Sequence, residues 1–166
     1  HKPEETNVTK LRNITGAILA GGKSSRMRRD KSLMDLEGKP FVQHVAEVLR
    51  KVFDRVIIVS SYKERLTFLG VPIYEDIFKQ RGPLGGIHSA LINTRHDSIF
   101  VVPCDMPLVQ PDVIRYVVQH CSPLFDVSVA SFHRRVIPLM GIYRRSCLKK
   151  LEREIIEGRF RVQDFL

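Results

Sequence analysis

The stretch ILAGGKSSRMRRDKS, Ile18–Ser32, joins an apolar run to two glycines and a cluster of basic residues. The apolar part is typical of a buried strand, and Gly21 and Gly22 follow where that strand should end. Because glycine has no side chain, backbone N–H groups in such a loop can approach an anion closely. We expect a strand that leads into a phosphate-binding loop; a plain turn with solvated charges is the alternative.

Two common phosphate-binding motifs do not fit this stretch. The P-loop pattern GxxxxGK[ST] fails because Gly16 lies one residue too far from Gly22, and the residues after the loop lack helical periodicity. The dinucleotide-binding pattern GxGxxG is absent. The loop therefore belongs to another type.

On either side of this loop, short β-branched runs alternate with segments of helical period. This alternation predicts a single α/β domain with a mostly parallel sheet and helices on both faces. The domain is expected over residues 14–166, with residues 1–13 as a disordered tail. Strands are expected at 15–20, 55–60, 72–75, 98–103, 126–131 and 138–143, and helices at 40–52, 84–93, 111–120 and 144–157.

Composition and charge narrow the class of partner. The chain carries 27 Lys and Arg against 18 Asp and Glu, a formal net charge of +9, which favours an anionic partner. It has no recognised nucleic-acid motif, so no nucleic-acid partner is expected. The three cysteines lack the spacing of a zinc site or a disulfide framework, and no apolar run approaches the roughly 20 residues of a membrane span. We expect a cytoplasmic protein with no membrane partner.

Three sequence blocks resemble the signature of the molybdenum cofactor guanylyltransferases, the MobA-like nucleotidyltransferases. YEDIFKQRGPLGGI, residues 74–87, resembles the family's E-D…G-P-L-x-G block, and VVPCDMPLV, residues 101–109, resembles its C-D-x-P block. The first block, LAGGKSSRM followed by DKSLMDLEGKP, resembles the pattern LAGGxSxRMGxxK with its G-K-P turn. It matches at Leu19, Ala20, Gly21, Gly22, Ser24, Arg26, Met27 and Lys31.

The resemblance implies a Rossmann-like nucleotidyltransferase that transfers GMP from MgGTP to the terminal phosphate of molybdopterin and releases pyrophosphate. It implies GTP and molybdopterin as substrates and Mg²⁺ as cofactor. The basic surplus of the chain suggests transient protein partners in cofactor delivery as well. The implied catalytic residues are Lys31, Arg26 and Asp105, with Asp105 as the metal ligand. The implied nucleotide-binding residues are Leu19, Ala20, Gly21, Gly22, Ser24, Lys31, Asp76 and Asp105.

The chemistry of nucleotidyl transfer fits these residue types. The charge of a triphosphate has to be neutralised before its α-phosphate is attacked, and Arg26 and Lys31 supply cations behind the glycines. Asp105 follows the apolar run SIFVVP, so its carboxylate should emerge at the carboxyl end of a buried strand, where open α/β sheets bind ligands. Mg²⁺ favours such carboxylates together with phosphate oxygens. For Asp105, and more so for Asp76, an ordinary turn carboxylate is the alternative.

Gly21 bears on the choice of base. Relatives that use CTP tend to begin L-A-A-G, whereas the guanylyltransferases begin L-A-G-G, as this chain does. The missing Cβ at Gly21 leaves room for a purine. We therefore expect GTP, with a CTP-dependent molybdenum cofactor cytidylyltransferase as the first alternative. A non-catalytic nucleotide- or nucleic-acid-binding module is the second.

The chain departs from the family pattern at several positions. Arg28 replaces a glycine, and Ser60 or Ser61 is expected to contact the nucleotide where relatives have Asn. The short connection at 132–135 and the ending at Leu166 suggest missing segments. Four arginines are candidates for binding the anionic pterin or a protein partner: Arg134, Arg135, Arg144 and Arg145.

Overall fold

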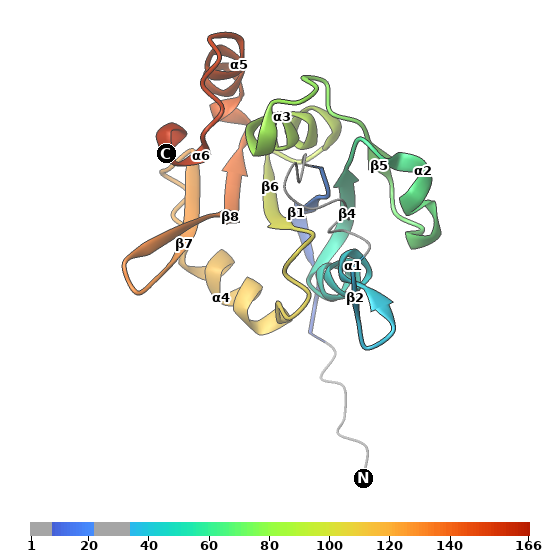
Figure 1. Cartoon of the computed structure of the whole chain (residues 1–166). Helices are drawn as coiled ribbons and strands as arrows, with labels where there is room; N and C mark the ends of the chain where they lie inside the picture. The colour runs from blue at the N-terminus through green and yellow to red at the C-terminus, as the bar shows by residue number, and fades with distance from the viewer. Residues whose placement is uncertain (1–7, 22–33) are drawn as a thin grey trace.

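The sheet lies at the centre of the computed structural model, which describes residues 8–21 and 34–166 (Figure 1). Its strand order is β5-β4-β1-β6-β8-β7. The strands β5, β4, β1 and β6 are parallel, whereas β8 is antiparallel to β6 and β7 is antiparallel to β8. The expected α/β fold with a mostly parallel sheet is therefore confirmed. The strands are β1 (Leu11–Leu19), β4 (Phe53–Val59), β5 (Ile73–Tyr74), β6 (Ser98–Pro103), β7 (Val127–Phe132) and β8 (Arg135–Arg144).

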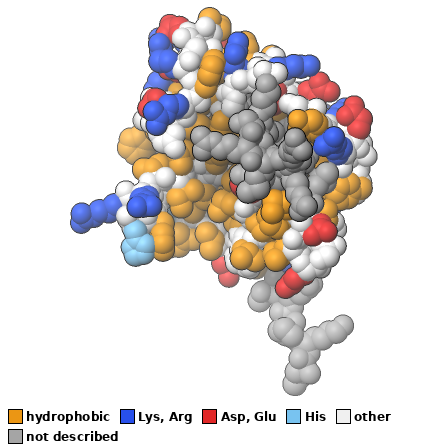
Figure 2. Space-filling view, viewed as in Figure 1, with side chains coloured by type: hydrophobic (Ala, Val, Ile, Leu, Met, Phe, Trp, Pro, Cys, Tyr) orange, Lys and Arg blue, Asp and Glu red, His pale blue; other side chains and the backbone are white. Residues whose placement is uncertain are grey.

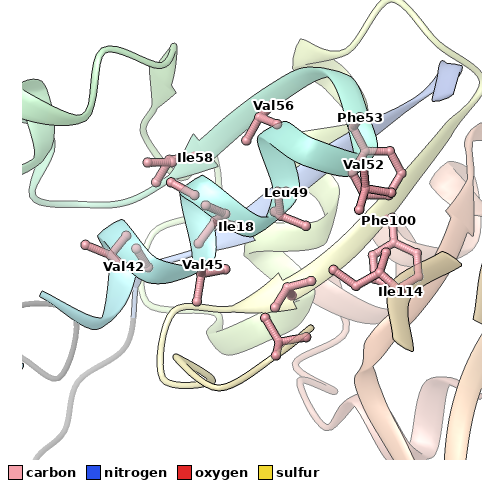
Figure 3. Close-up of a cluster of buried hydrophobic side chains, with 14 of the residues drawn as sticks. Ile18, Val42, Val45, Leu49, Val52, Phe53, Val56, Ile58, Phe100 and Ile114 are labelled. Atoms are coloured by element: carbon pink, nitrogen blue, oxygen red, sulfur yellow. The ribbon is translucent and has the colours of Figure 1, made fainter. Parts of the chain in front are cut away.

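Helices cover both faces of the sheet, as the sequence predicts. On β1, Ile18 packs in a cluster with α1 (Phe41–Val52) and α4 (Pro111–His120). Its neighbours Ala17 and Leu19 pack in a second cluster with α3 (Gly82–Asn93) and α5 (Leu148–Ile156). Figure 3 shows the first cluster, where side chains of α1 meet those of β1, β4 and β6. Successive residues of a strand point to opposite faces, so one apolar run fills both cores.

Several short elements were not expected from the sequence. The strands β2 (Asp35–Leu36) and β3 (Lys39–Pro40) form a two-stranded sheet before α1. The others are α2 (Lys63–Leu66), η2 (Thr67–Leu69), η3 (Arg145–Cys147) and α6 (Val162–Phe165). No helix in the described part of the chain is long and apolar enough to cross a membrane.

Two boundaries differ from the sequence-based expectation. Strand β1 begins at Leu11, so residues 11–13 belong to the sheet and not to a disordered tail. The helix expected over 144–157 is divided, because Arg144 ends β8 and α5 starts only at Leu148. At both places polar residues extend an apolar strand, and hydrogen bonding to neighbouring strands outweighs local propensity.

The short connection at 132–135 forms the turn of the β7–β8 hairpin. Phe132 pairs with Arg135, so His133 and Arg134 alone form the turn. Their φ angles are +47° and +62°, the left-handed conformation that a two-residue hairpin turn of type I′ requires. The connection is therefore a tight turn made by residues that adopt this conformation at some energetic penalty.

Candidate functional site

The carboxyl ends of the parallel strands meet at one edge of the sheet. The Ala20 N–H donates to the carbonyl of Val59 at 2.9 Å, and the Cys104 N–H donates to the carbonyl of Leu19 at 3.1 Å. The Ser60 N–H donates to the carbonyl of Tyr74 at 2.9 Å. The chain leaving β1, β4, β5 and β6 is thereby held together at the edge where open α/β sheets bind ligands.

A cavity of about 510 Å³ opens at this edge, beside the N-terminus of α3. Its walls combine apolar and polar groups contributed by four parts of the chain: the end of β1, the residues after β4, the residues after β5, and the start of α3. The lining includes Leu19, Gly21, Val59, Ser61, Tyr62, Asp76, Arg81 and Pro83. A cavity of this size and mixed character suits a small organic ligand with polar edges.

Asp76 lines this cavity, and one of its carboxylate oxygens has no hydrogen-bond partner among the described residues. Ser61 Oγ donates to Asp76 Oδ2 at 3.4 Å. The other oxygen, Oδ1, is buried and has no hydrogen-bond partner within the described residues. Burial raises the pKa of the Asp76 carboxyl, and the Ser61 hydrogen bond only partly opposes that rise. A buried acceptor without a partner is unfavourable, so a ligand that brings N–H donors would be bound favourably here.

Glycines allow the walls of the cavity to come close together. A Cβ on Gly21 would lie 3.3 Å from Asp76 Oδ2, and one on Gly86 would lie 3.1 Å from Leu19 Cδ2. A Cβ on Gly85 would lie 3.0 Å from the carbonyl oxygen of Phe78. The glycines of the two motifs thus serve close packing between the end of β1, the loop after β5 and helix α3.

The structure distinguishes the two serines after β4. Ser60 is fully buried, and its hydroxyl donates to the carbonyl of Ala20 at 3.1 Å and accepts from the Tyr62 N–H at 3.0 Å. Ser61 is exposed and lines the cavity. Ser60 therefore holds the strand ends together, and Ser61 is the serine that faces the cavity.

The backbone at the end of β1 is largely used within the fold. The Leu19 carbonyl accepts from Cys104, and both the N–H and the carbonyl of Ala20 are bonded to the end of β4. Leu19 still contributes its side chain to the cavity, whereas Ala20 does not line it. Of the residues predicted to bind a nucleotide, Ala20 is therefore used within the fold, whereas the Leu19 side chain and Gly21 face the cavity.

Asp105 lies apart from the cavity wall, in the turn that follows β6. It is exposed, and the preceding residue, Cys104, hydrogen bonds to Leu19 at the end of β1. The turn therefore holds Asp105 at the carboxyl edge of the sheet, as its sequence position predicts. In the ranges 8–21 and 34–166, no three or more His, Cys, Asp and Glu residues come together as a metal cluster.

Part of the predicted site lies outside the described residues. This group comprises the phosphate-binding and catalytic candidates of the basic loop, together with the arginine that replaces a family glycine: Gly22, Ser24, Arg26, Arg28 and Lys31.

Sequence reasoning missed four side chains that line the cavity: Val59, Tyr62, Gln80 and Arg81. Arg81 stands directly before the Gly-Pro-Leu motif and is the N-cap residue of α3. The signal that could have found it is a basic residue at the start of a helix that borders the ligand edge. Tyr62 has no comparable signal, because its position depends on how the chain turns after β4.

Two of the four arginines that the sequence suggested for binding an anionic partner instead form hydrogen bonds within the fold. Arg144 donates to Ser98 Oγ at 3.0 Å and to the Phe125 carbonyl at 2.9 Å. Arg145 donates to the Thr94 carbonyl at 2.8 Å. Arg134 and Arg135 remain exposed, and Figure 2 shows basic and histidine side chains projecting at the tip of the β7–β8 hairpin.

The open sheet, the cavity at its carboxyl edge and the motif glycines that shape it define an α/β nucleotidyltransferase domain. The comparison with known families gives the same class: the MobA-like NTP transferase domain matches residues 16–165. The chain therefore belongs to the MobA-like NTP transferase family.

Similar proteins extend this result. A probable molybdenum cofactor guanylyltransferase of Carboxydothermus hydrogenoformans is 34% identical, over 93% of this chain and 78% of its own length. One from Clostridium perfringens is 38% identical, over 87% of this chain and 72% of its own. The structure of molybdopterin-guanine dinucleotide biosynthesis protein A from Archaeoglobus fulgidus has a TM-score of 0.74 and 25% identity, covering 92% of this chain and 78% of that one.

Proposed function

We propose that this enzyme transfers GMP from GTP to the terminal phosphate of molybdopterin, forming molybdopterin guanine dinucleotide and releasing pyrophosphate. The names of relatives more than 30% identical over most of the chain support this assignment. The observation in the structure that carries it is the cavity at the carboxyl edge of the sheet, where Asp76 presents a buried oxygen with no partner among the described residues.

The Asp76 carboxylate favours guanine as the base. Guanine offers two neighbouring donors, N1–H and the N2 amino group, which can meet the two oxygens of one carboxylate. Cytosine and adenine each offer a single amino group and have an acceptor, N3 or N1, beside it. The apolar side chains of Leu19, Val59 and Pro83 would cover the faces of the ring. The base would therefore lie between β1 and α3.

With its base in that position, the triphosphate would extend toward the basic loop that follows Gly21. Arg26 and Lys31, both outside the described residues, are proposed to neutralise the phosphates and the leaving pyrophosphate. A phosphate oxygen of molybdopterin then attacks the α-phosphorus. A new P–O bond forms as the bond between the α-phosphorus and the bridging oxygen breaks, and pyrophosphate leaves with that electron pair. No covalent enzyme intermediate is required.

Asp105 is the proposed ligand of Mg²⁺. It is an exposed carboxylate at the ligand-binding edge, with no further metal-ligating cluster in the described part of the chain. One carboxylate suffices for Mg²⁺, which takes most of its remaining ligands from phosphate oxygens and water. When bound, the ion would supply positive charge beside the phosphates. The residue type and its place in the fold fit this role.

The setting of the reaction is also a proposal. We place the enzyme in the cytoplasm, where the thiols of Cys104, Cys121 and Cys147 would stay reduced. The exposed basic tip of the β7–β8 hairpin offers a surface for transient contact with the anionic pterin or with a protein that carries it.

The test measures pyrophosphate release by the purified protein with Mg²⁺ and molybdopterin, comparing GTP, CTP and ATP. We expect release with GTP, little release when molybdopterin is omitted, and a loss of about 10²- to 10³-fold in Asp105→Asn. Release with CTP in preference to GTP would move the protein to the cytidylyltransferases. No release with any nucleotide would overturn the proposed transfer reaction.

A further inference from the structure

Arg81 is the one cationic side chain among the described residues that line the cavity. It is the N-cap residue of α3, between Gln80 with φ +60° and Gly82 with φ +60°. A Cβ on Gly85 would lie 3.3 Å from Arg81 Cβ and 4.0 Å from Asp76 Oδ1. The guanidinium-bearing residue and the unpartnered carboxylate oxygen therefore meet around the same glycine of α3.

An aromatic ring holds the Arg81 head group. The guanidinium carbon lies 4.9 Å from the centre of the Phe160 ring. A cation–π contact engages the charge of the guanidinium and leaves N–H donors available for a ligand. Within residues 8–21 and 34–166, Arg81 forms no ion pair that would compete for those donors.

Phe160 itself is fixed in place. It is partly buried against the core cluster that contains α3 and α5. The neighbouring Arg159 forms two hydrogen bonds with Glu154 near the end of α5, at 2.6 and 3.0 Å, and a third with Glu157. The turn after α5 is thus anchored, so Phe160 can position Arg81 at the cavity rim.

We infer that Arg81 reads the O6 and N7 edge of guanine, and that Phe160 positions it for this contact. This inference rests on the proposed function and names a specificity-determining residue for it. An arginine fork matches the paired acceptors O6 and N7 of guanine. Asp76 would meet the donors of the adjacent Watson–Crick edge, N1–H and the N2 amino group, so that two charged groups contact neighbouring edges of one base. A carboxylate beside Arg81 would repel phosphates, which places the base and not the triphosphate at this end of the cavity.

The experiment measures Kd by calorimetry for GTP and two analogues. 7-Deaza-GTP lacks the N7 acceptor, and ITP lacks the N2 amino group. For the wild-type protein we expect both analogues to bind on the order of tenfold more weakly than GTP. In Arg81→Met, 7-deaza-GTP and GTP should bind with about equal Kd. The weaker binding of ITP should persist, because Asp76 is unchanged.

Lys79→Met is the matched control. Lys79 lies two residues away in the same loop, its side chain is 74% exposed, and it does not line the cavity. Its loss removes the same charge, so both analogue penalties should remain. An equal loss of affinity for GTP and 7-deaza-GTP in Arg81→Met would mean a phosphate contact and would overturn the inference.

Phe160 is tested through the same ratio. In Phe160→Leu the 7-deaza-GTP penalty should shrink while the apolar packing is largely kept, and Phe160→Tyr should restore it. A merely structural role of Phe160 would leave the ratio of the two Kd values unchanged. The inference and the proposed function fail differently: a wild-type protein that binds no GTP refutes the function. GTP binding without a 7-deaza-GTP penalty refutes only the role of Arg81.

Discussion

The parallel and antiparallel halves of the sheet differ in what they contribute to the site. The strands β5, β4, β1 and β6 all end at the same edge, so Gly21, Ser61, Asp76 and Asp105 gather there although they are far apart in sequence. Strands β8 and β7 run antiparallel at the other side and supply no described residue to the cavity. The parallel half brings the candidate site residues together through topology, whereas the antiparallel half completes the core.

The largest effect is expected from Gly141 in the antiparallel half. A Cβ there would lie 2.2 Å from the carbonyl oxygen of Ser128 and 2.5 Å from Val129 Cα, and backbone atoms cannot move aside without opening the β7–β8 pairing. Gly141→Ala should lower the free energy of unfolding by about 3 kcal/mol or more, and Tm by roughly 6–12 °C. Thermal and urea unfolding would measure the loss.

Gly38→Ala is the matched control for that prediction. Gly38 has φ +78° and nothing within 4 Å of an added Cβ, so only backbone strain of about 1 kcal/mol is expected. If the two variants lose equal stability, the close approach at Gly141 does not limit the packing of β7 on β8.

The difference between the halves also explains what the sequence could predict. The apolar run SIFVVP marks β6 to the residue, because a strand buried on both faces is continuously apolar. In contrast, β8 begins at Arg135, three residues before the expected start, and its exposed beginning carries no such signal.

The site was predictable only where a motif carries its chemistry. Gly21, Asp76 and Asp105 stand in motif positions, and strand order brings them to one edge. A basic residue before the Gly-Pro-Leu motif could have marked Arg81 as a candidate. Sequence could not show its contact with Phe160, which lies 79 residues later and reaches it through the packing of α3 against α5. Nor could sequence show that Ser60 is buried while Ser61 faces the cavity.

A smaller effect is expected in the parallel half from Gly21→Ala. The new Cβ would lie 3.3 Å from Asp76 Oδ2, so the carboxylate would have to shift by a few tenths of an ångström within the proposed guanine site. GTP affinity should fall about tenfold, close to 1.4 kcal/mol, while Tm changes little. Calorimetric titration with GTP and CTP checks this. The ratio of the Kd for CTP to the Kd for GTP should be smaller in the variant than in the wild-type protein. An unchanged Kd for GTP would separate Gly21 from base selection.

Substitutions at the tip of the β7–β8 hairpin are expected to raise the stability of the fold. His133 and Arg134 adopt positive φ angles that Asn and Gly accept more readily. The double variant His133→Asn, Arg134→Gly should therefore raise the free energy of unfolding by about 1 kcal/mol. The Kd for GTP should stay at the wild-type value, because the tip does not line the cavity. A weaker Kd would show that the antiparallel half does contribute to nucleotide binding.

The smallest effect concerns the stability of the site itself. Burial raises the pKa of Asp76, so the folded protein holds that proton more firmly than the unfolded chain does. The favourable contribution of Asp76 is therefore present below the unfolded pKa of about 4 and is lost as pH rises through the higher folded pKa. Asp76→Asn should stabilise the fold at pH 7 by less than about 1 kcal/mol, since the group is partly exposed, and the gain should vanish below about pH 4.

Urea unfolding between pH 3.5 and 8 measures this dependence, with Asp105→Asn as the control. Asp105 is exposed, so the unfolding free energy of its variant should stay near that of wild type. The same variant should lose turnover, because Asp105 is the proposed Mg²⁺ ligand. Asp76→Asn should instead gain stability at neutral pH and lose affinity for GTP, because an amide cannot accept both guanine donors. A destabilised Asp76→Asn at pH 7 would mean that the ionised carboxylate supports the fold without ligand. The cavity would then be a structural feature, and the contrast between the two carboxylates would fail.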